Sequence, residues 1–189
     1  MSKFLLLLGP SGVGKSTIIE ELIRIDERFT YISPYMTRGL RNGEKNKISI
    51  SNDQMNELWG KGELLVINTL YDNVRYATPR YPIIQAFEEN RFPVLDWPIS
   101  RIQIMTESFS DQLYLVYIAP SSINVLKNRL TIDGRDTDGK RLENARNELR
   151  AYWSHEYDGI FNLEIVSEEN EITQIAHTIY DNYLLSFKL

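Results

Sequence analysis

One short stretch, Gly9 to Ser16, constrains this chain more than any other. It reads G-P-S-G-V-G-K-S and fits the phosphate-binding loop pattern G-x-x-x-x-G-K-[ST] at every fixed position. Glycines let the backbone curl with several N–H groups directed at phosphate, and the lysine adds a mobile positive charge. The motif therefore predicts a nucleoside triphosphate as ligand, with Lys15 acting on its phosphates.

The residues that flank this loop have the character that the motif requires. Residues 4–8 are continuously apolar, which is typical of a buried strand, and apolar side chains recur at helical spacing over residues 18–25. A helix that begins at the loop adds attraction for anionic phosphate. We therefore predict a nucleotide-binding loop over Pro10, Ser11, Gly12, Val13, Gly14, Lys15, Ser16 and Thr17.

Length and composition narrow the remaining classes. A chain of 189 residues suits one domain with, at most, a small inserted lobe. The formal net charge of −5 argues against nucleic acid as a partner, because binding the phosphate backbone needs a basic face. The sequence has no cysteine, which excludes disulfides and thiolate metal sites. Since no apolar run approaches a membrane span, we expect a cytoplasmic protein with no membrane partner. We also expect it to be a monomer or a homodimer.

Beyond the loop, predicted strands and helices alternate along most of the chain. Strands are expected at residues 29–33, 92–97, 113–118 and 160–166. A helix is expected at residues 98–108. Further helices are expected where apolar side chains share one face, namely Ile83, Ile84 and Phe87; Ile123, Leu126 and Leu130; Leu142, Ala145, Leu149 and Trp153; Ile172, Ile175, Ile179, Tyr183 and Leu184. This alternation predicts an α/β fold whose parallel sheet is covered by helices on both faces.

Residues 34–78 interrupt this alternation. Short strands are expected at residues 48–50, 64–67 and 74–78. One helix is expected to start with a capping box that pairs Ser51 with Gln54. This helix places Met55, Leu58 and Trp59 on one face. We therefore expect one domain, residues 1–189, with a core of residues 1–33 and 79–189 and a small lobe of residues 34–78. A loop without apolar side chains, residues 133–139, is expected to be solvated.

Together these residues resemble the guanylate kinase family over nearly the whole chain. That family follows a loop reading G-P-S-G-x-G-K-[ST] with a T-R-x-x-R segment and then G-E in a small acceptor-binding lobe. Here the corresponding stretches are residues 9–16, 37–41 and 43–44. The likeness continues with an arginine-bearing lid, residues 133–141. The resemblance implies ATP-dependent phosphoryl transfer to a small phosphorylated acceptor, GMP by default, with ATP and Mg²⁺ as cofactors.

The same resemblance suggests roles for individual side chains. Arg38 and Arg41 would grip the acceptor phosphate, and Arg135 and Arg141 would close over the donor phosphates. Asp96, at a strand end, resembles the carboxylate that holds magnesium through water and orients the acceptor. The implied catalytic residues are Lys15, Arg38, Asp96, Arg135 and Arg141; the implied substrate-binding residues are Arg38, Arg41, Tyr76, Thr78 and Asp96; the implied metal ligands are Ser16 and Asp96.

Departures from the family pattern fall at contacts with the acceptor base. The chain has Pro34 where the family has a serine, and Val66 where the family has the glutamate that contacts the guanine edge. Pro98 replaces a second acid. Asn68 and Thr69 are the nearest polar residues that could contact a base instead. A neutral contact discriminates among bases less strongly than a carboxylate, so the sequence predicts weak guanine selectivity.

Two alternative functions therefore stay open. A kinase for a non-nucleotide phosphorylated molecule, such as a ribose phosphate, would keep the arginines and lose the base contacts. A non-catalytic binding module of guanylate kinase type would belong to a different class, but such modules characteristically lose the phosphate loop. This chain keeps Lys15, Ser16 and Asp96, which favours an enzyme.

Overall fold

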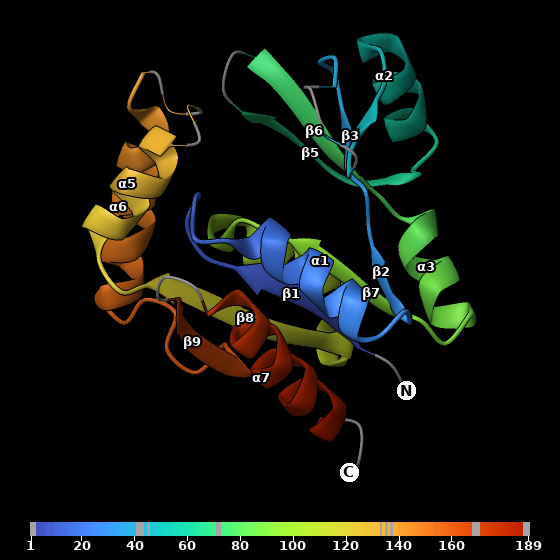
Figure 1. Cartoon of the computed structure of the whole chain (residues 1–189). Coiled ribbons are helices and arrows are strands. Elements are labelled where there is room, and N and C mark those ends of the chain that lie inside the picture. Colours follow the sequence, from blue (N-terminus) through green and yellow to red (C-terminus); the bar gives the residue numbers. More distant parts are fainter. Residues whose placement is uncertain are drawn as a thin grey trace.

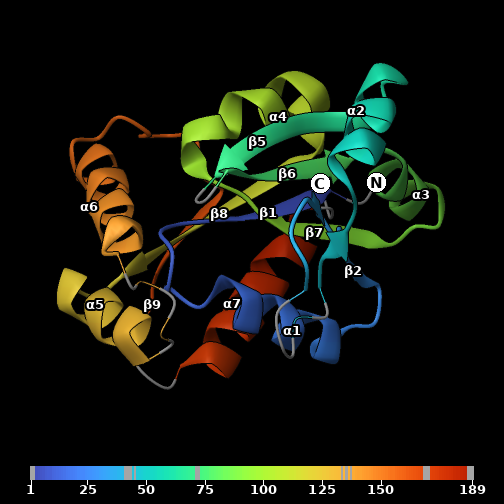
Figure 2. The same ribbon diagram turned by 90° about the horizontal axis from the view of Figure 1, so that it is seen from above.

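A parallel sheet forms the centre of the computed structural model, which describes residues 3–40, 44, 46–70, 73–132, 134, 136, 138–167 and 171–186. Its five strands lie in the order β2-β7-β1-β8-β9 (Figures 1 and 2). Their bounds are β1 Phe4–Leu8, β2 Phe29–Tyr31, β7 Phe92–Asp96, β8 Leu113–Pro120 and β9 Leu163–Ser167. Every neighbouring pair is parallel, so all the carboxyl ends meet at one edge.

Helices cover both faces of this sheet, as Figure 2 shows most clearly. One face carries α1 (Lys15–Ile25) and α7 (Ile172–Leu185), and the other carries α3 (Tyr81–Glu88) and α4 (Ile102–Phe109). Alternate residues of β1 divide between two hydrophobic clusters, one on each face. A strand buried on both sides must be apolar throughout, and this explains the run at residues 4–8. The predicted fold class is confirmed.

Two further helices, α5 (Ile123–Ile132) and α6 (Lys140–Trp153), lie beside the β8 and β9 side of the sheet (Figure 1). Short 3-10 turns at Ile99–Arg101 and Ser110–Gln112 flank α4. None of the helices in the described part of the chain combines the length and the apolar character needed to cross a bilayer.

A second, smaller sheet lies apart from the first in Figure 1. Its order is β4-β3-β6-β5, with bounds β3 Tyr35–Met36, β4 Ile48–Ser49, β5 Leu64–Leu70 and β6 Val74–Pro79. One helix, α2 (Asn52–Gly60), packs on it through Met55, which is fully buried with Leu64 and Ala77. The long antiparallel pair β5–β6 is the part of this sheet that later matters for the site.

Some details of the sequence-based expectation were wrong. The last strand begins at Leu163 rather than at residue 160. Three side chains expected inside are about half exposed, namely Trp59 at 51%, Ile84 at 49% and Trp153 at 56%. Helix α3 packs through Ile83 instead of Ile84, whose direction differs by about 100° around the helix axis. Both tryptophans lie in the last turn of their helices, beyond the clusters that bury the earlier turns.

The capping box at the start of α2 is confirmed. The Ser51 hydroxyl accepts a hydrogen bond from the Gln54 N–H at 3.1 Å, and the Gln54 side chain accepts one from the Ser51 N–H at 2.8 Å. We expect Ser51→Ala to lower the free energy of unfolding by about 1 kcal/mol, because one helix donor loses its partner. Urea unfolding measures this change, with Gln54→Glu as a control that keeps the box. A loss within experimental error would contradict it.

Candidate active site

The phosphate loop joins β1 to α1, at the carboxyl edge of the sheet. Its backbone takes left-handed φ values at Gly9 (+127°) and Gly14 (+104°), which favour glycine. A Cβ added to Gly9 would lie 2.3 Å from the carbonyl oxygen of Ile118 on the neighbouring strand. Any other residue at position 9 would therefore displace the loop from the sheet.

Two long-range contacts fix the far end of the loop. The Val13 carbonyl oxygen accepts hydrogen bonds from the Ser167 hydroxyl and from an Arg129 N–H, both at 3.2 Å. Ser167 is fully buried at the end of β9, and Arg129 comes from α5. Sequence reasoning missed both residues, because nothing in the local sequence connects them with the loop. The loop is thus anchored by elements more than a hundred residues away.

Lys15 lies folded back against its own loop. Its Nζ donates hydrogen bonds to the carbonyl oxygens of Gly9 and Pro10, the second at 2.9 Å. Burial lowers the pKa of Lys15, while the negative charges of Glu148 and Asp96 oppose that shift. Glu148, on α6, is a further residue that sequence reasoning missed. Burial raises its pKa, and its Oε1 atom has no hydrogen-bond partner in the described part of the chain.

A cavity of about 470 Å³ opens over the loop. Of the predicted nucleotide-binding residues, six line it: Ser11, Gly12, Gly14, Lys15, Ser16 and Thr17. Pro10 and Val13 do not, because Pro10 is buried and the Val13 side chain belongs to the hydrophobic core. Their backbone carbonyl groups hold the loop together, since that of Pro10 accepts from Lys15 and that of Val13 accepts from Ser167.

The hydroxyl of Ser16 and the carboxylate of Asp96 share this cavity. Among the described residues there is no group of three or more acidic, histidine or cysteine side chains that could hold a metal. Magnesium commonly keeps several water ligands and takes only one or two groups from the protein beside the phosphates. One hydroxyl and one carboxylate therefore fit Mg²⁺ bound together with a nucleotide.

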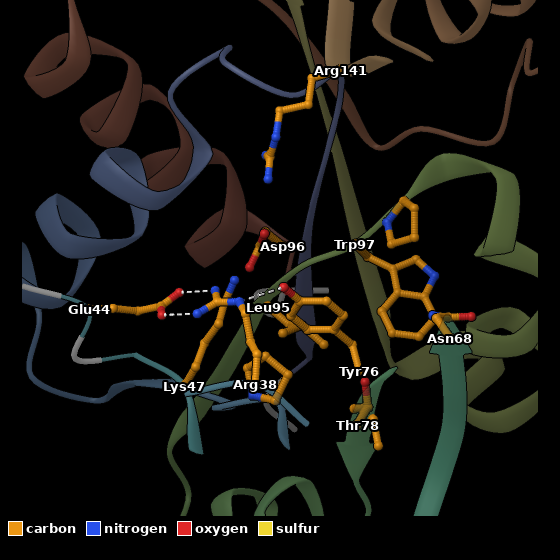
Figure 3. A pocket seen from close by; sticks show the side chains of 13 residues that line it. Arg38, Glu44, Lys47, Asn68, Tyr76, Thr78, Leu95, Asp96, Trp97 and Arg141 are labelled. Atoms are coloured by element: carbon orange, nitrogen blue, oxygen red, sulfur yellow. Dashed lines mark hydrogen bonds and ion pairs between the residues drawn. The ribbon is translucent and has the colours of Figure 1, made fainter. Parts of the chain in front are cut away.

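A second cavity, of about 220 Å³, lies between the small sheet and the end of β7 (Figure 3). Arg38 occupies one side of it and forms a two-pronged ion pair with Glu44, with both N–O distances at 2.7 Å. The Arg38 Nε also donates to the Tyr76 hydroxyl at 3.3 Å. A planar guanidinium held this way presents the fork geometry that suits a phosphate or carboxylate.

The two cavities meet at three charged side chains that line both of them, namely Lys47, Asp96 and Arg141. Asp96 ends β7 beside β1, where its register partner is Leu7, so the sheet itself places this carboxylate next to the loop. Asp136 accepts hydrogen bonds from the backbone N–H groups of Arg141 and Leu142 and so holds the first turn of α6. Lys47 was not singled out from the sequence.

The structure thus brings together most of the residues implied by the family resemblance. Lys15, Arg38, Tyr76, Thr78, Asp96 and Arg141 all line one or both cavities. Arg41 and Arg135 lie outside the described residues. Of the two polar candidates for a base contact, Asn68 lines the second cavity, whereas Thr69 is exposed and does not.

Tyr31 provides a contact to Asp96 that the sequence did not indicate. Its hydroxyl donates to Asp96 Oδ1 at 2.8 Å, across the β2–β7 pair. Burial, and then the negative charge of Asp96, raise the pKa of Tyr31 well above its usual range. Tyr31 therefore remains a neutral donor at physiological pH and holds one oxygen of the carboxylate in place.

We expect Tyr31→Phe to lower kcat by about tenfold, because a hydrogen bond to a charged group contributes about 1.5–3 kcal/mol and only part of it acts on orientation. Steady-state kinetics measure this effect. Tyr180→Phe is the matched control: its hydroxyl also bonds an aspartate, Asp26, but that residue lines neither cavity. An unchanged kcat in Tyr31→Phe would show that Asp96 needs no such support.

The parallel sheet, the glycine loop anchored to it, and the lysine and serine at its end define the class of P-loop kinases. The family model for guanylate kinase matches residues 1–181. The chain is 31% identical to the guanylate kinase of Malacoplasma penetrans, over 96% of this chain and 94% of that protein. It is also 31% identical to the guanylate kinase of Trichodesmium erythraeum, over 90% of this chain and 91% of that protein.

A solved structure shares the fold. The crystal structure of guanylate kinase from Anaplasma phagocytophilum superposes with a TM-score of 0.76 at 19% identity, covering 100% of this chain and 87% of that one. The chain therefore belongs to the guanylate kinase family and is a nucleotide kinase that transfers phosphoryl groups.

Proposed function

We propose that this protein transfers the terminal phosphoryl group of ATP to a nucleoside monophosphate, with GMP as the acceptor that family membership favours, to give ADP and the diphosphate. One observation carries the proposal. A cavity over the phosphate loop and a cavity beside Arg38 meet at Asp96, Lys47 and Arg141, so a donor and an acceptor phosphate can approach each other there.

On the donor side, the chain supplies charge and backbone donors. The loop N–H groups surround the triphosphate, and Lys15 exchanges the carbonyl oxygens of Gly9 and Pro10 for phosphate oxygens. Phosphoryl transfer depends mainly on positioning and on neutralising the charge of the transferred group. Arg141, at the junction, adds a second positive charge to the one on Lys15.

On the acceptor side, Arg38 holds the phosphate. In the structure its guanidinium is engaged by Glu44, so an incoming phosphate must displace that carboxylate or share the fork with it. Asp96 helps orient the acceptor at the junction, and the Tyr31 hydroxyl holds Oδ1 of the Asp96 carboxylate in place. Residues 34–78 thereby serve as an acceptor-binding lobe, and residues 133–141 as a lid over the donor.

Mg²⁺ would be held by the Ser16 hydroxyl and, through water, by Asp96. When bound, the ion neutralises charge on the phosphates. In this proposal the small phosphorylated acceptor is the principal partner of the protein. We expect the protein to act as a monomer or a homodimer.

An assay of ADP release across a panel of acceptors tests the proposal. The panel contains GMP, AMP, UMP, CMP and two ribose phosphates, each with ATP and Mg²⁺. We expect release with GMP and no release with the ribose phosphates. Turnover with a ribose phosphate alone would favour the non-nucleotide acceptor, and ATP binding without turnover of any acceptor would favour a binding module.

A further inference from the structure

The register of β5 against β6 decides which side chains face the acceptor cavity. Val66 lies opposite Thr78, and Asn68 lies opposite Tyr76. Directly opposed residues of an antiparallel pair project from the same face of the sheet. Tyr76, Thr78 and Asn68 all line the cavity, so this face is the one turned toward the acceptor. Thr69 lies opposite Arg75 on the other face and is exposed.

Asn68 is a buried polar side chain whose hydrogen bonding is incomplete. Only 9% of it is exposed, and its Oδ1 atom has no hydrogen-bond partner in the described part of the chain. Buried polar atoms are almost always satisfied, so an unpartnered one beside a cavity calls for an explanation. A ligand in the cavity would supply the missing partner.

The charged groups of the cavity gather away from Asn68. Figure 3 shows Arg38, Glu44 and Lys47 on one side of Tyr76, and Asn68 beside Trp97 on the other. The second buried polar side chain of this face is Thr78, whose hydroxyl is also neutral. An acceptor with its phosphate at Arg38 would therefore place its base next to a neutral amide.

A primary amide offers one donor and one acceptor side by side. Guanine presents O6 as an acceptor next to the N1–H donor, and adenine presents an N6–H donor next to the N1 acceptor. The asparagine amide matches either edge, because a rotation of about 180° about its Cβ–Cγ bond exchanges its donor and its acceptor. A carboxylate, which only accepts, matches only an edge with two adjacent N–H donors.

We propose that Asn68 is the specificity-determining residue of the acceptor site, that it pairs with the six-position edge of a purine, and that the site accepts both guanine and adenine monophosphates. The inference rests on the proposed function, since it presumes that the acceptor is a nucleotide. The wild-type ratio of kcat/KM for GMP to that for AMP should stay below about 100, because neutral hydrogen bonds discriminate weakly.

Substitutions at position 68 test this proposal through that same ratio. Asn68→Asp is nearly isosteric and replaces the donor by an acceptor, so the base should shift until guanine presents its adjacent N1–H and N2–H donors. Adenine has no such pair of adjacent ring and exocyclic donors, so the GMP to AMP ratio should rise at least about tenfold. Asn68→Leu should lower kcat/KM at least about tenfold for both nucleotides and leave their ratio near its wild-type value. Thr69→Ala, on the opposite face of the same strand, is the matched control and should change neither.

The ratio is measured within one preparation, so a partly unfolded variant does not distort it. An Asn68→Asp ratio within threefold of wild type, in an enzyme that phosphorylates GMP, would overturn the role of Asn68 and leave the proposed function standing. A wild-type ratio clearly above about 100 would also overturn it. If the wild-type protein releases no ADP with any nucleoside monophosphate, the proposed function itself fails.

Discussion

Lys15→Ala should lower kcat on the order of 1000-fold or more, the largest loss expected from any single substitution in this chain. Lys15 carries the positive charge that lies within the loop itself and already contacts its carbonyl groups. Alanine removes the charge that acts on the transferring phosphate. Steady-state kinetics with the preferred acceptor measure the loss, and a kcat within tenfold of wild type would remove the basis for the donor site.

The same variant has a distinct effect on stability, because Lys15 opposes the raised pKa of Glu148. A carboxyl whose pKa is higher in the folded than in the unfolded state binds protons more tightly when folded, so stability falls as pH rises through that interval. Without Lys15 the folded-state pKa of Glu148 should rise further above the ordinary glutamate value of about 4.3, so the pH interval over which stability falls becomes wider. Thermal unfolding from pH 4.5 to 8 should thus show a steeper decline in Lys15→Ala than in the wild type, and Lys15→Ala/Glu148→Gln should abolish the part of the decline that Glu148 causes.

Arg38→Ala should lower kcat/KM for the acceptor on the order of 100-fold, as expected when one partner of a partly buried charge pair is truncated. Two effects combine. The acceptor phosphate loses its bidentate donor, and the Glu44 carboxylate, which loses its ion pair with Arg38, repels the phosphate. The KM for ATP should stay within about threefold, because Arg38 does not line the cavity over the loop.

A double substitution separates these two effects. Arg38→Ala/Glu44→Gln removes the repelling charge and should recover about tenfold of the lost kcat/KM. Arg38→Lys keeps the charge but loses the fork, so its kcat/KM should lie between wild type and Arg38→Ala. A loss of less than about fivefold in Arg38→Ala would contradict an acceptor phosphate at Arg38.

The sequence predicted those features that depend on nearby residues. The loop from Gly9 to Ser16 and the capping box at Ser51 each depend on residues that are close together in the sequence. Both lie at the start of a helix, as expected. The parallel sheet followed from the alternation of apolar strands and amphipathic helices. Trp153 was misplaced because helical spacing gives a direction but not the point at which packing ends.

Contacts between distant segments could not be predicted in the same way. Tyr31 reaches Asp96 only because β2 and β7 are neighbours, and Ser167 reaches the loop only because β9 ends beside it. Whether Asn68 or Thr69 faces the acceptor cavity depends on the register of β5 against β6. A shift of that register by one residue would turn Thr69 toward the cavity and Asn68 away from it.

The central position of β1 has a consequence for biosynthesis. Within this sheet β1 is translated before its partners on both sides, β7 and β8, which span Phe92–Asp96 and Leu113–Pro120. Its apolar residues must therefore wait, unpaired, until most of the chain has been translated. Such delayed, non-local pairing slows folding and exposes aggregation-prone surface.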